Sequence, residues 1–543
     1  MEKITSGNTI SHPSLWEGLG GLPKEFIDYT SSLFGEERWK NYLASFEESV
    51  PVSVRLNPFK CRPTRPLPPP SPVEREPECS KDSLFKGDIY DFIGDDCDRI
   101  GSLSTGEGGG RGRITPVPWC RNAYYLSERP NFTLDPLLHA GVYYVQEAGS
   151  MFLDEVLKTL SSSPLKGEDC GDANIANLLS PTGSLPTGEG GGRGRSCVLD
   201  LCAAPGGKST LLRAALPDDC VLYSNEPDRR RANILMENMQ KQGHPNVIVT
   251  NNYAIDYQKS GHTFDLIVCD VPCSGEGMFR KDHDSIGEWS LQNVMKCASL
   301  QRSIIEDIWP CLNEGGVMVY STCTFNLHED EENVKWICET LGAEIIPIEV
   351  REEWNITGSL LKGWDKPVYR FIPGTTKGEG LFMAVLKKKE ARPLPPPSPV
   401  EREPECSKDS LFKGDIYDFI GNDCDRIGSL STGEGGGRGR SRRSSLLRVL
   451  SDGHPVGTQK GKNIIPAHAE ALLINLPKDK YPFAELTKED ALKYLHHEAI
   501  VLDAEVPKGF VVVTYQGHPL GFVKNIGNRA NNLYPQEWKI RNL

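Results

Sequence analysis

Two cysteines stand where a thiol could carry out covalent chemistry. Cys273 lies in the stretch DVPCSGEGM, residues 270–278, and Cys323 lies in YSTCT, residues 320–324. Each stretch follows an apolar run that predicts a strand, and open α/β sheets bind ligands beyond the carboxyl ends of their strands. A lone cysteine is more often a small buried apolar residue. Two cysteines in turns of Pro, Ser, Thr and Gly at neighbouring strand ends favour a reactive pair of thiols.

The stretch DLCAAPGGKST, residues 200–210, indicates a turn of small residues between a strand and a helix. Small residues let a ligand approach the backbone, and the first turn of a helix offers free N–H groups. A phosphate-binding P-loop would need glycine where Cys202 stands, so an ATPase site is not favoured. The candidate cofactor-binding residues of this turn are Cys202, Ala203, Ala204, Pro205, Gly206, Gly207 and Lys208.

Glu226 ends the next apolar run, in the sequence YSNE. A carboxylate at this edge of a sheet can accept hydrogen bonds from both hydroxyls of a ribose. The chain carries no second glycine fingerprint that would bind a dinucleotide. The pattern therefore favours a mononucleoside cofactor such as S-adenosylmethionine over NAD.

Short apolar runs separated by helical stretches predict a parallel sheet covered on both faces. These runs are residues 198–201, 221–224, 247–250, 266–269 and 317–320. Before them, a helical pattern runs from Leu22 towards Phe46, and residues 52–58 alternate like a strand that stops at proline. After them, residues 509–524 are typical of a hairpin in a small β-rich domain.

Two nearly identical segments interrupt this pattern. Residues 65–113 recur at 392–440 with Asp95 replaced by Asn422, and a shorter copy of their glycine-rich end stops at Arg195. Their PPP and GEGGGRGR ends cannot form a packed repeat, which predicts disordered low-complexity inserts. Because each doubling of a surface loop costs only about 0.6 kcal/mol, the host fold can accommodate them.

The composition limits the class of protein. The chain has 543 residues, of which 38% are hydrophobic and 25% charged, and it lacks an apolar run of membrane-spanning length and an apolar signal core. Its 16 cysteines include no C-x-x-C pair, which argues against a zinc site and a disulfide scaffold. We expect a cytoplasmic protein without a bound metal. The net charge of −13 excludes a uniformly basic RNA-coating protein but not an enzyme with a local basic groove.

Taken in order, DLCAAPGGKST, DVPCSGEGMFRK and STCT resemble the motifs of the Nop/Sun family of RNA cytosine-C5 methyltransferases. Residues 55–58 (RLNP) resemble the family's N-terminal signature, and residues 146–151 (QEAGSM) resemble its segment before the cofactor domain. The stretches at 515–521 and 531–538 resemble the tail of the bacterial RsmF-type members, which methylate 16S ribosomal RNA of the small subunit.

This resemblance implies a Rossmann-like class I methyltransferase core at residues 146–391, with a loop insert at about 161–195. A small N-terminal α+β domain at 1–145 and a β-rich PUA-like domain at 441–543 would bind RNA, and residues 392–440 would form a disordered linker. The implied cofactor is S-adenosylmethionine and the implied partner is ribosomal RNA. The resemblance describes a monomeric enzyme that needs neither a membrane nor a metal.

By the same resemblance, Cys323 is the nucleophile that adds to C6 of cytosine, after which C5 attacks the methyl group of the cofactor. Cys273 helps to remove the C5 proton. Asp270 bonds the N3 side of the ring and contacts the cofactor, and Lys208 places a positive charge near both. DNA cytosine-C5 enzymes suggest a rival assignment, in which Cys273 is the nucleophile.

Three further features of the sequence allow alternative interpretations. Family members commonly carry an acid after the third strand, where this chain has Asn252 and Tyr253, and either residue could contact adenine. The acidic run HEDEEN at 328–333 is expected to be a solvated helix start rather than a metal site. Transfer RNA as the substrate, and a non-catalytic RNA-binding assembly factor, are the alternative functions.

Overall fold

The computed structural model describes residues 21–61, 114–162, 196–389, 447–455, 457–460 and 463–541. These residues form two compact units. The first is drawn from Met1–Pro51, Val271–Ile304 and Tyr320–Leu386, and the second from Val52–Asp270, Ile305–Val319 and Lys387–Leu543. The predicted disordered segments at 65–113 and 392–440, and the loop insert beyond residue 162, lie outside the described residues. Within the described ranges, no helix is long and apolar enough to cross a membrane.

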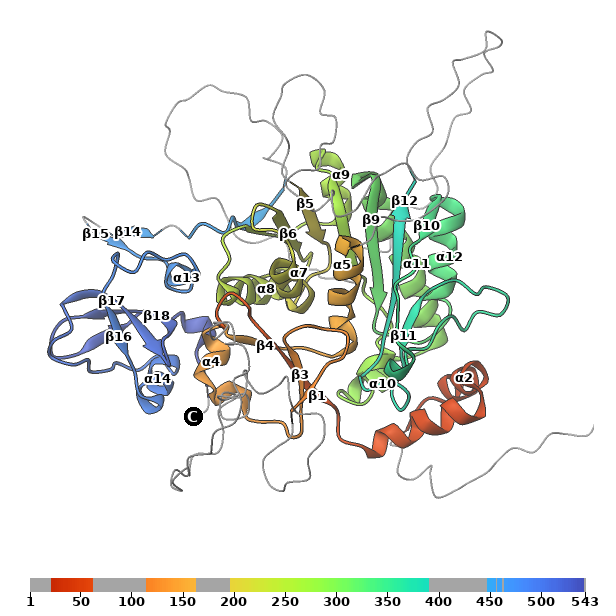
Figure 1. Cartoon of the computed structure of the whole chain (residues 1–543), viewed down its shortest axis with the longest axis horizontal. Coiled ribbons are helices and arrows are strands. Elements are labelled where there is room, and N and C mark those ends of the chain that lie inside the picture. Colours follow the sequence, from red (N-terminus) through yellow and green to blue (C-terminus); the bar gives the residue numbers. More distant parts are fainter. Residues whose placement is uncertain are drawn as a thin grey trace, which may run out of the picture. The chain divides into compact units, whose positions relative to one another are not determined.

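The centre of the second unit is a parallel sheet with the strand order β8-β5-β6-β7, of which Figure 1 labels β5 and β6. Its strands are β5 (Cys197–Asp200), β6 (Val221–Asn225), β7 (Val247–Thr250) and β8 (Phe264–Asp270). They are connected by helices α7 (Gly207–Ala215), α8 (Arg229–Gln242) and α9 (Ala254–Ser260). Strand β9 (Leu312–Thr322) lies beside β8 through its residues up to Val319. The predicted parallel sheet is confirmed, and the burial of β8 from Phe264 to Cys269 fits a strand covered on both faces.

A four-stranded antiparallel sheet belongs to the same unit and has the strand order β2-β3-β1-β4. Its strands are β1 (Val52–Leu56), β2 (Thr115–Pro116), β3 (Ala123–Leu126) and β4 (Tyr143–Val145). The helices of this region are α4 (Pro136–His139) and α5 (Leu153–Ser162). The predicted strand at 52–58 is therefore β1, which ends before Pro58.

The RLNP stretch joins β1 to helices α7 and α8. Arg55 Nε donates to Gln146 Oε1 at 3.0 Å, and Arg55 Nη2 donates to Thr210 Oγ1 of α7 at 2.6 Å. Asn57 Nδ2 donates to the Gln242 carbonyl at the end of α8 at 3.0 Å. Because the last carbonyls of a helix have no partner within the helix, Asn57 satisfies one of them and holds the N-terminal sheet against the core.

The C-terminal part of the second unit is β-rich, as the predicted hairpin indicated (blue in Figure 1). The hairpin strands are β17 (Gly509–Tyr515) and β18 (His518–Asn525), flanked by β16 (Phe483–Glu485) and β19 (Ala530–Asn532). The shorter elements are β13 (Val449–Ser451), β14 (Thr458–Lys460), β15 (Asn463–Ile465), α13 (His468–Ala471) and α14 (Lys488–Leu495). Val511 and Tyr494 share one apolar core with Val54 and Leu137 of the N-terminal sheet region.

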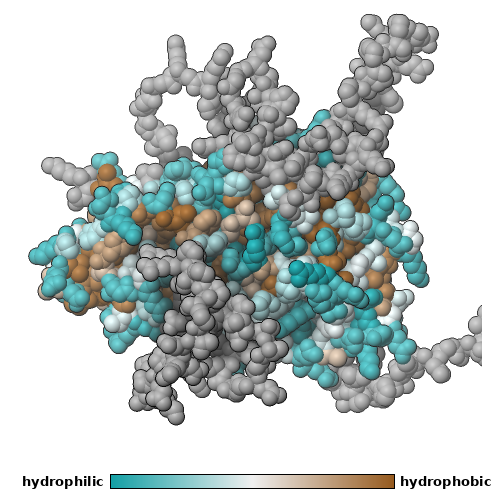
Figure 2. Space-filling view, viewed as in Figure 1, coloured by the Kyte–Doolittle hydropathy of each residue, from teal (hydrophilic) through white to brown (hydrophobic). Residues whose placement is uncertain are grey.

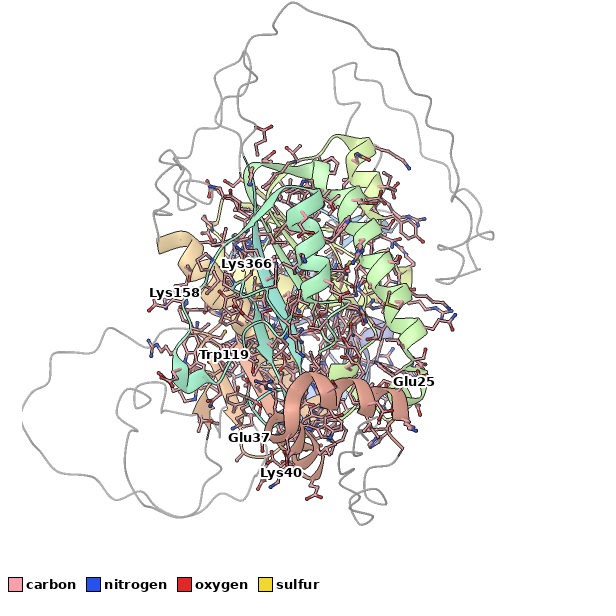
Figure 3. All side chains as sticks on the ribbon, turned by 90° about the vertical axis from the view of Figure 1, so that its right-hand side faces the viewer. Glu25, Glu37, Lys40, Trp119, Lys158 and Lys366 are labelled. Carbon is pink, nitrogen blue, oxygen red and sulfur yellow. The ribbon has the colours of Figure 1, made fainter. Side chains whose placement is uncertain are left out.

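The first unit is built around an aromatic cluster that includes helix α2 (Lys24–Ala44). Its buried aromatic residues are Phe26, Phe34, Tyr42, Phe279, Trp289 and Phe325. The ring centroids of Phe26 and Phe279 lie 5.1 Å apart in an edge-on arrangement, which is favourable for aromatic pairs. The predicted helix towards Phe46 is confirmed, with a break at Gly35, whose φ is +74°. Figure 3 labels three of the exposed charged residues of α2, which are Glu25, Glu37 and Lys40.

The remaining elements of the first unit lie between the motifs and after them. They are η5 (Glu276–Met278), α10 (Asp284–Glu288), α11 (Leu291–Ile308, up to Ile304), α12 (Glu331–Thr340), β10 (Ala343–Ile345), η7 (Glu352–Trp354), β11 (Tyr369–Phe371) and β12 (Leu381–Lys388, up to Leu386). Strands β11 and β12 pair antiparallel. Figure 2 shows hydrophilic and hydrophobic residues interspersed on one face of the described chain.

Candidate active site

The glycine-rich turn lies between β5 and α7, as the sequence predicted. Strand β5 ends at Asp200, and α7 begins at Gly207. Gly206, just before the helix, has a φ of +120°. Residues that carry a Cβ atom rarely adopt this backbone conformation. The first N–H groups of α7 are therefore presented at the carboxyl edge of the sheet, where they can face a polar ligand.

Asp200, at the end of β5, is a fully buried carboxylate that the predicted site residues did not include. Ser209 Oγ donates to Asp200 Oδ2 at 2.6 Å, and Asp200 Oδ1 makes no hydrogen bond. Burial raises the pKa of Asp200 to about 7, although the bond from Ser209 and the charge of Lys208 act in the opposite direction. A buried carboxylate with one unpartnered oxygen is able to accept a further hydrogen bond from a ligand.

Glu226 follows β6 and is also almost completely buried. Its Oε1 accepts a hydrogen bond from the Asp228 N–H at 3.0 Å. Its Oε2 makes no hydrogen bond of good geometry, although Arg231 Nη1 lies 3.5 Å away. Burial raises the pKa of Glu226, and the charge of Arg231 partly offsets this. A buried carboxylate oxygen without a hydrogen bond at this sheet edge suits the hydroxyl group of a ribose.

Lys208 and Asp270 form an ion pair in the second unit, with Lys208 Nζ 2.9 Å from Asp270 Oδ2. Burial lowers the pKa of Lys208, but the contact with Asp270 more than compensates, so the pKa is raised overall. The lysine side chain is 9% exposed and the aspartate side chain 34% exposed. The carboxylate can thus reach a ligand while the ammonium group holds it in place. Burial also raises the pKa of the Cys202 thiol well above its usual range.

The two cysteines of the sequence prediction lie together in the first unit. Cys273 Sγ is 3.0 Å from Cys323 Sγ, and the Cys323 N–H donates to Cys273 Sγ at 3.3 Å. Both are free thiols. The hydrogen bond with Cys323, together with burial, raises the pKa of the Cys273 thiol well above its usual range. The expected proximity of the two sulfur atoms is therefore confirmed, while the role of each remains a prediction.

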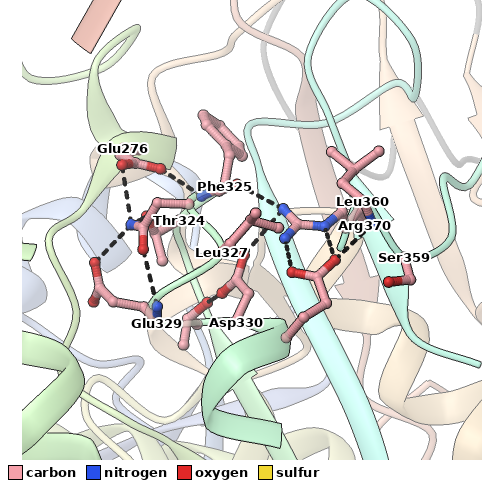
Figure 4. A network of polar contacts seen from close by, with 12 residues as sticks. Glu276, Thr324, Phe325, Leu327, Glu329, Asp330, Ser359, Leu360 and Arg370 are labelled. Atoms are coloured by element: carbon pink, nitrogen blue, oxygen red, sulfur yellow. Dashed lines mark hydrogen bonds and ion pairs between the residues drawn. The ribbon is translucent and has the colours of Figure 1, made fainter. Parts of the chain in front are cut away.

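Two buried carboxylates join the turns that carry these cysteines (Figure 4). Glu276 Oε2 accepts from the Phe325 N–H at 2.5 Å, and Glu329 Oε2 accepts from the Ser274 N–H at 3.0 Å. Asn326 Nδ2 donates to both acids, at 3.1 Å to Glu276 Oε1 and at 2.8 Å to Glu329 Oε1. Each acid therefore binds the backbone of the turn opposite its own, and together they fix the separation of the two sulfur atoms.

The acidic run at 328–333 corrects one sequence expectation. Helix α12 does begin here, but Glu329, Asp330 and Glu331 are fully buried rather than solvated. Arg370 Nε donates to Glu331 Oε1 at 2.8 Å, and Arg370 Nη1 lies 3.1 Å from Asp330 Oδ2. Arg370 Nη1 also donates to the Phe325 carbonyl at 2.7 Å, which extends the network to the Cys323 turn (Figure 4). Among the described residues, no group of three or more metal-binding side chains could hold an ion.

Sequence reasoning missed the positioning acids for different reasons. Glu276 stands inside the quoted motif DVPCSGEGM, so its place next to Cys273 was a usable signal. Glu329 gave no such signal, because the sequence of an acidic run does not distinguish side chains exposed to solvent from side chains that are buried and paired. Burial raises the pKa of Glu329 to about 7, and the nearby charge of Glu276 adds to this effect.

Three family descriptions match the chain. Residues 193–387 match the 16S rRNA methyltransferase RsmB/F family, residues 482–540 match the RsmF PUA domain, and residues 105–148 match the RsmF N-terminal domain. The chain belongs to the RsmB/F methyltransferase family. The RsmB/F assignment confirms the predicted class I methyltransferase core and the PUA domain at the C-terminal end.

The RsmB/F relatives align over most of the chain. The ribosomal RNA small subunit methyltransferase F of Shigella flexneri serotype 5b is 28% identical over 452 residues, covering 78% of this chain and 84% of that protein. The protein of the same name from Escherichia coli O139:H28 is 28% identical over 457 residues, with the same coverage. Among solved structures, a methyltransferase homologue from Pyrococcus horikoshii matches with a TM-score of 0.48 at 22% identity, covering 70% of this chain and 100% of that one.

Proposed function

We propose that this protein methylates C5 of a cytosine in 16S ribosomal RNA of the small subunit, with S-adenosylmethionine as the methyl donor. The observation that carries the proposal is the pair of free thiols, Cys273 and Cys323, 3.0 Å apart in a member of the RsmB/F family. Relatives named ribosomal RNA small subunit methyltransferase F support the choice of RNA. We place the enzyme in the cytoplasm, where it would act as a monomer.

The residues at the carboxyl edge of the second unit's sheet fit a nucleoside cofactor. Glu226 Oε2 and Asp200 Oδ1 are buried carboxylate oxygens without a hydrogen bond, and both suit hydroxyl or amino donors. We assign Cys202 to Lys208, Glu226 and Asp270 to cofactor binding, as the sequence predicted. When bound, S-adenosylmethionine supplies an electrophilic methyl group on a sulfonium.

The covalent chemistry falls to the two thiols. Cytosine C5 is a poor nucleophile until a thiolate adds at C6, which turns C5 into an enamine-like carbon. We assign this attack to Cys323. The raised pKa of Cys273 keeps the proton on the Cys273 thiol, whose S–H group can donate a hydrogen bond to the Cys323 thiolate 3.0 Å away. Once the Cys323 sulfur is bonded to C6, it no longer raises the pKa of Cys273 as a thiolate neighbour, so Cys273 can release its proton to solvent. After methylation, the Cys273 thiolate accepts the C5 proton, and the bond between C6 and Cys323 breaks with its electrons returning to the Cys323 sulfur.

Asp270 and Lys208 would support the base while this happens. Asp270 is partly exposed and is fixed by Lys208, so it can bond the N3 side of the ring. The positive charge of Lys208 would offset the negative charge that develops on addition. The target base must leave its stack to reach Cys323. We propose that the regions 1–145 and 441–543 hold the RNA for the catalytic region 146–391 by contacts to the RNA backbone and shape.

Replacement of each cysteine tests the assignment of roles. Cys323→Ala should abolish any covalent complex with RNA, because no sulfur remains to add at C6. Cys273→Ala should let the covalent complex accumulate, because elimination is blocked. The complex is measured as a shifted band on a denaturing gel. The reverse pattern would make Cys273 the nucleophile and overturn the assignment.

The RNA target is tested by bisulfite mapping of ribosomal RNA from cells with and without the protein. We expect one protected cytosine in 16S RNA to disappear when the gene is deleted and to return with the intact gene but not with the Cys323→Ala variant. Loss of a protected cytosine in transfer RNA instead would refute the ribosomal substrate. No change in any RNA, together with no methyl transfer by the purified protein, would refute the enzymatic function.

A further inference from the structure

A short strand from outside the matched family regions completes the cofactor sheet. Strand β13 lies between the RsmB/F match, which ends at residue 387, and the PUA match, which begins at 482. It pairs antiparallel with β7, with Val449 opposite Thr250 and Ser451 opposite Val249. An added strand satisfies backbone groups that β7 would otherwise leave open at the sheet edge.

The contact just before β13 is more specific than strand pairing. Asn252 uses both groups of its amide on the main chain of Arg448: Oδ1 accepts from the Arg448 N–H at 2.8 Å, and Nδ2 donates to the Arg448 carbonyl at 3.2 Å. The Asn251 N–H donates to the same carbonyl at 2.9 Å. Asn252 is one of the two residues that the sequence suggested as a contact for adenine. Its side chain instead forms hydrogen bonds with another segment of this chain.

Further hydrogen bonds connect Arg448 to the turn that carries Glu226, the carboxylate proposed to bind ribose. Asn251 Nδ2 donates to the carbonyls of Glu226 and Pro227, at 2.8 Å each, while Asn251 Oδ1 accepts from Arg448 Nη1 at 3.3 Å. The Asn252 N–H donates to Asn225 Oδ1 at 3.0 Å. The turn after β7 thus connects Arg448 directly to the turn that carries Glu226.

Asn225 extends the connection to the glycine-rich turn. Its Nδ2 donates to the carbonyls of Leu201 and Asn252, at 2.9 Å each. The Ala203 N–H donates to the Asn225 carbonyl at 2.8 Å. A continuous set of hydrogen bonds therefore runs from Arg448 through the turns after β7, β6 and β5.

We propose that Arg448, Asn251 and Asn252 form a latch that holds the cofactor-binding turns in the shape that binds the nucleoside part of S-adenosylmethionine. This inference rests on the proposed function. Without the latch, the turns must be ordered when the cofactor binds, and that cost is subtracted from the binding free energy. These three residues are positioning residues, and their loss weakens cofactor binding without changing the chemical step.

Two substitutions of one residue test the latch. Arg448→Pro removes the N–H that Asn252 Oδ1 accepts, whereas Arg448→Ala keeps both main-chain groups and loses only the longer side-chain bond to Asn251. Titration calorimetry of the full-length chain with S-adenosylmethionine should show a Kd about tenfold higher for Arg448→Pro, as expected for the loss of one hydrogen bond. The Kd of Arg448→Ala should stay within about twofold of the original protein. In methyl transfer, the KM for the cofactor should rise in parallel for Arg448→Pro while kcat at saturation is unchanged.

A second variant keeps the test decisive if Arg448→Pro does not fold. Asn252→Ala removes the same bond from the other side, together with the bond from Asn252 Nδ2 to the Arg448 carbonyl, and should raise the Kd by at least as large a factor. A merely structural role predicts a lower active fraction and a lower kcat with an unchanged Kd, and this result would overturn the proposal. Equal Kd values for Arg448→Pro and Arg448→Ala would also overturn it. If the original protein binds no S-adenosylmethionine at all, the proposed function fails instead.

Discussion

Replacement of Glu276 by glutamine should separate the two cysteine turns while leaving the size of the side chain almost unchanged. The carboxylate accepts three hydrogen bonds: from Phe325 N at 2.5 Å, from Trp289 Nε1 at 2.9 Å and from Asn326 Nδ2 at 3.1 Å. A glutamine has a single acceptor oxygen, and its NH₂ group is a donor. Whichever way the amide is turned, at least one of these buried donors then faces another donor.

The expected loss in the free energy of unfolding can be worked out for the more favourable of the two orientations of the amide in Glu276→Gln. With its oxygen towards Trp289 and Asn326, the substitution leaves only the Phe325 N–H unsatisfied, which costs about 1–3 kcal/mol. The two remaining bonds lose their charge assistance, at roughly 1 kcal/mol each. Removal of the Glu276 charge also removes its repulsion with Glu329 and its own desolvation penalty, which offsets part of this destabilisation. We therefore expect a net loss of about 2–4 kcal/mol in the free energy of unfolding.

Two measurements check this expectation. Urea unfolding of Glu276→Gln gives the free energy, and Glu37→Gln on the exposed face of α2 serves as the matched control, with a change within about 0.5 kcal/mol (Figure 3). Mild oxidation with diamide followed by mass spectrometry reports how readily the Cys273 and Cys323 sulfur atoms meet. We expect slower disulfide formation in Glu276→Gln than in the control. Unchanged stability together with unchanged oxidation would show that Glu276 does not set the separation of the thiols.

Other buried polar groups lead to further predictions. Arg370→Met leaves Asp330 and Glu331 buried without their cation, so unfolding free energy should fall by about 3–5 kcal/mol; a loss below 1 kcal/mol in urea titration would contradict the network. Burial lowers the pKa of His468 to about 3, whereas in the unfolded chain this histidine has its ordinary pKa of 6.5. The unfolded state therefore binds a proton that the folded state does not, and stability is lost as the pH falls from 6.5 towards 3. The stability of the original protein relative to His468→Leu should therefore drop by about 2 kcal/mol between pH 7 and pH 5, and a pH-independent difference would refute the burial of a neutral ring. Asn57→Ala should cost about 2 kcal/mol, because the carbonyls of Gly141 and of Gln242, at the end of α8, both lose their donor; an unaltered melting temperature would show that water replaces Asn57 there.

The sequence by itself determined the order of the core elements and indicated which residues could do chemistry at their ends. Five apolar runs with helical stretches between them identified β5 to β9, because strand and helix periodicities are local properties of the chain. The same reasoning placed Glu226, Cys273 and Cys323 just beyond strand ends, since the carboxyl edge of a parallel sheet follows from connectivity alone. The ordered motifs then indicated the family that the comparisons confirmed.

The tertiary structure alone decided which polar groups meet. Arg370 lies 39 residues from Glu331, and Arg448 lies 196 residues from Asn252, so no local pattern connects them. An acidic run looks solvated in sequence and becomes a buried network only when a distant arginine supplies the opposite charge. The physical reason is that the ionisation and pairing of a side chain depend on its burial and its neighbours in space, whereas its tendency to form a helix or strand depends mainly on its neighbours in the chain.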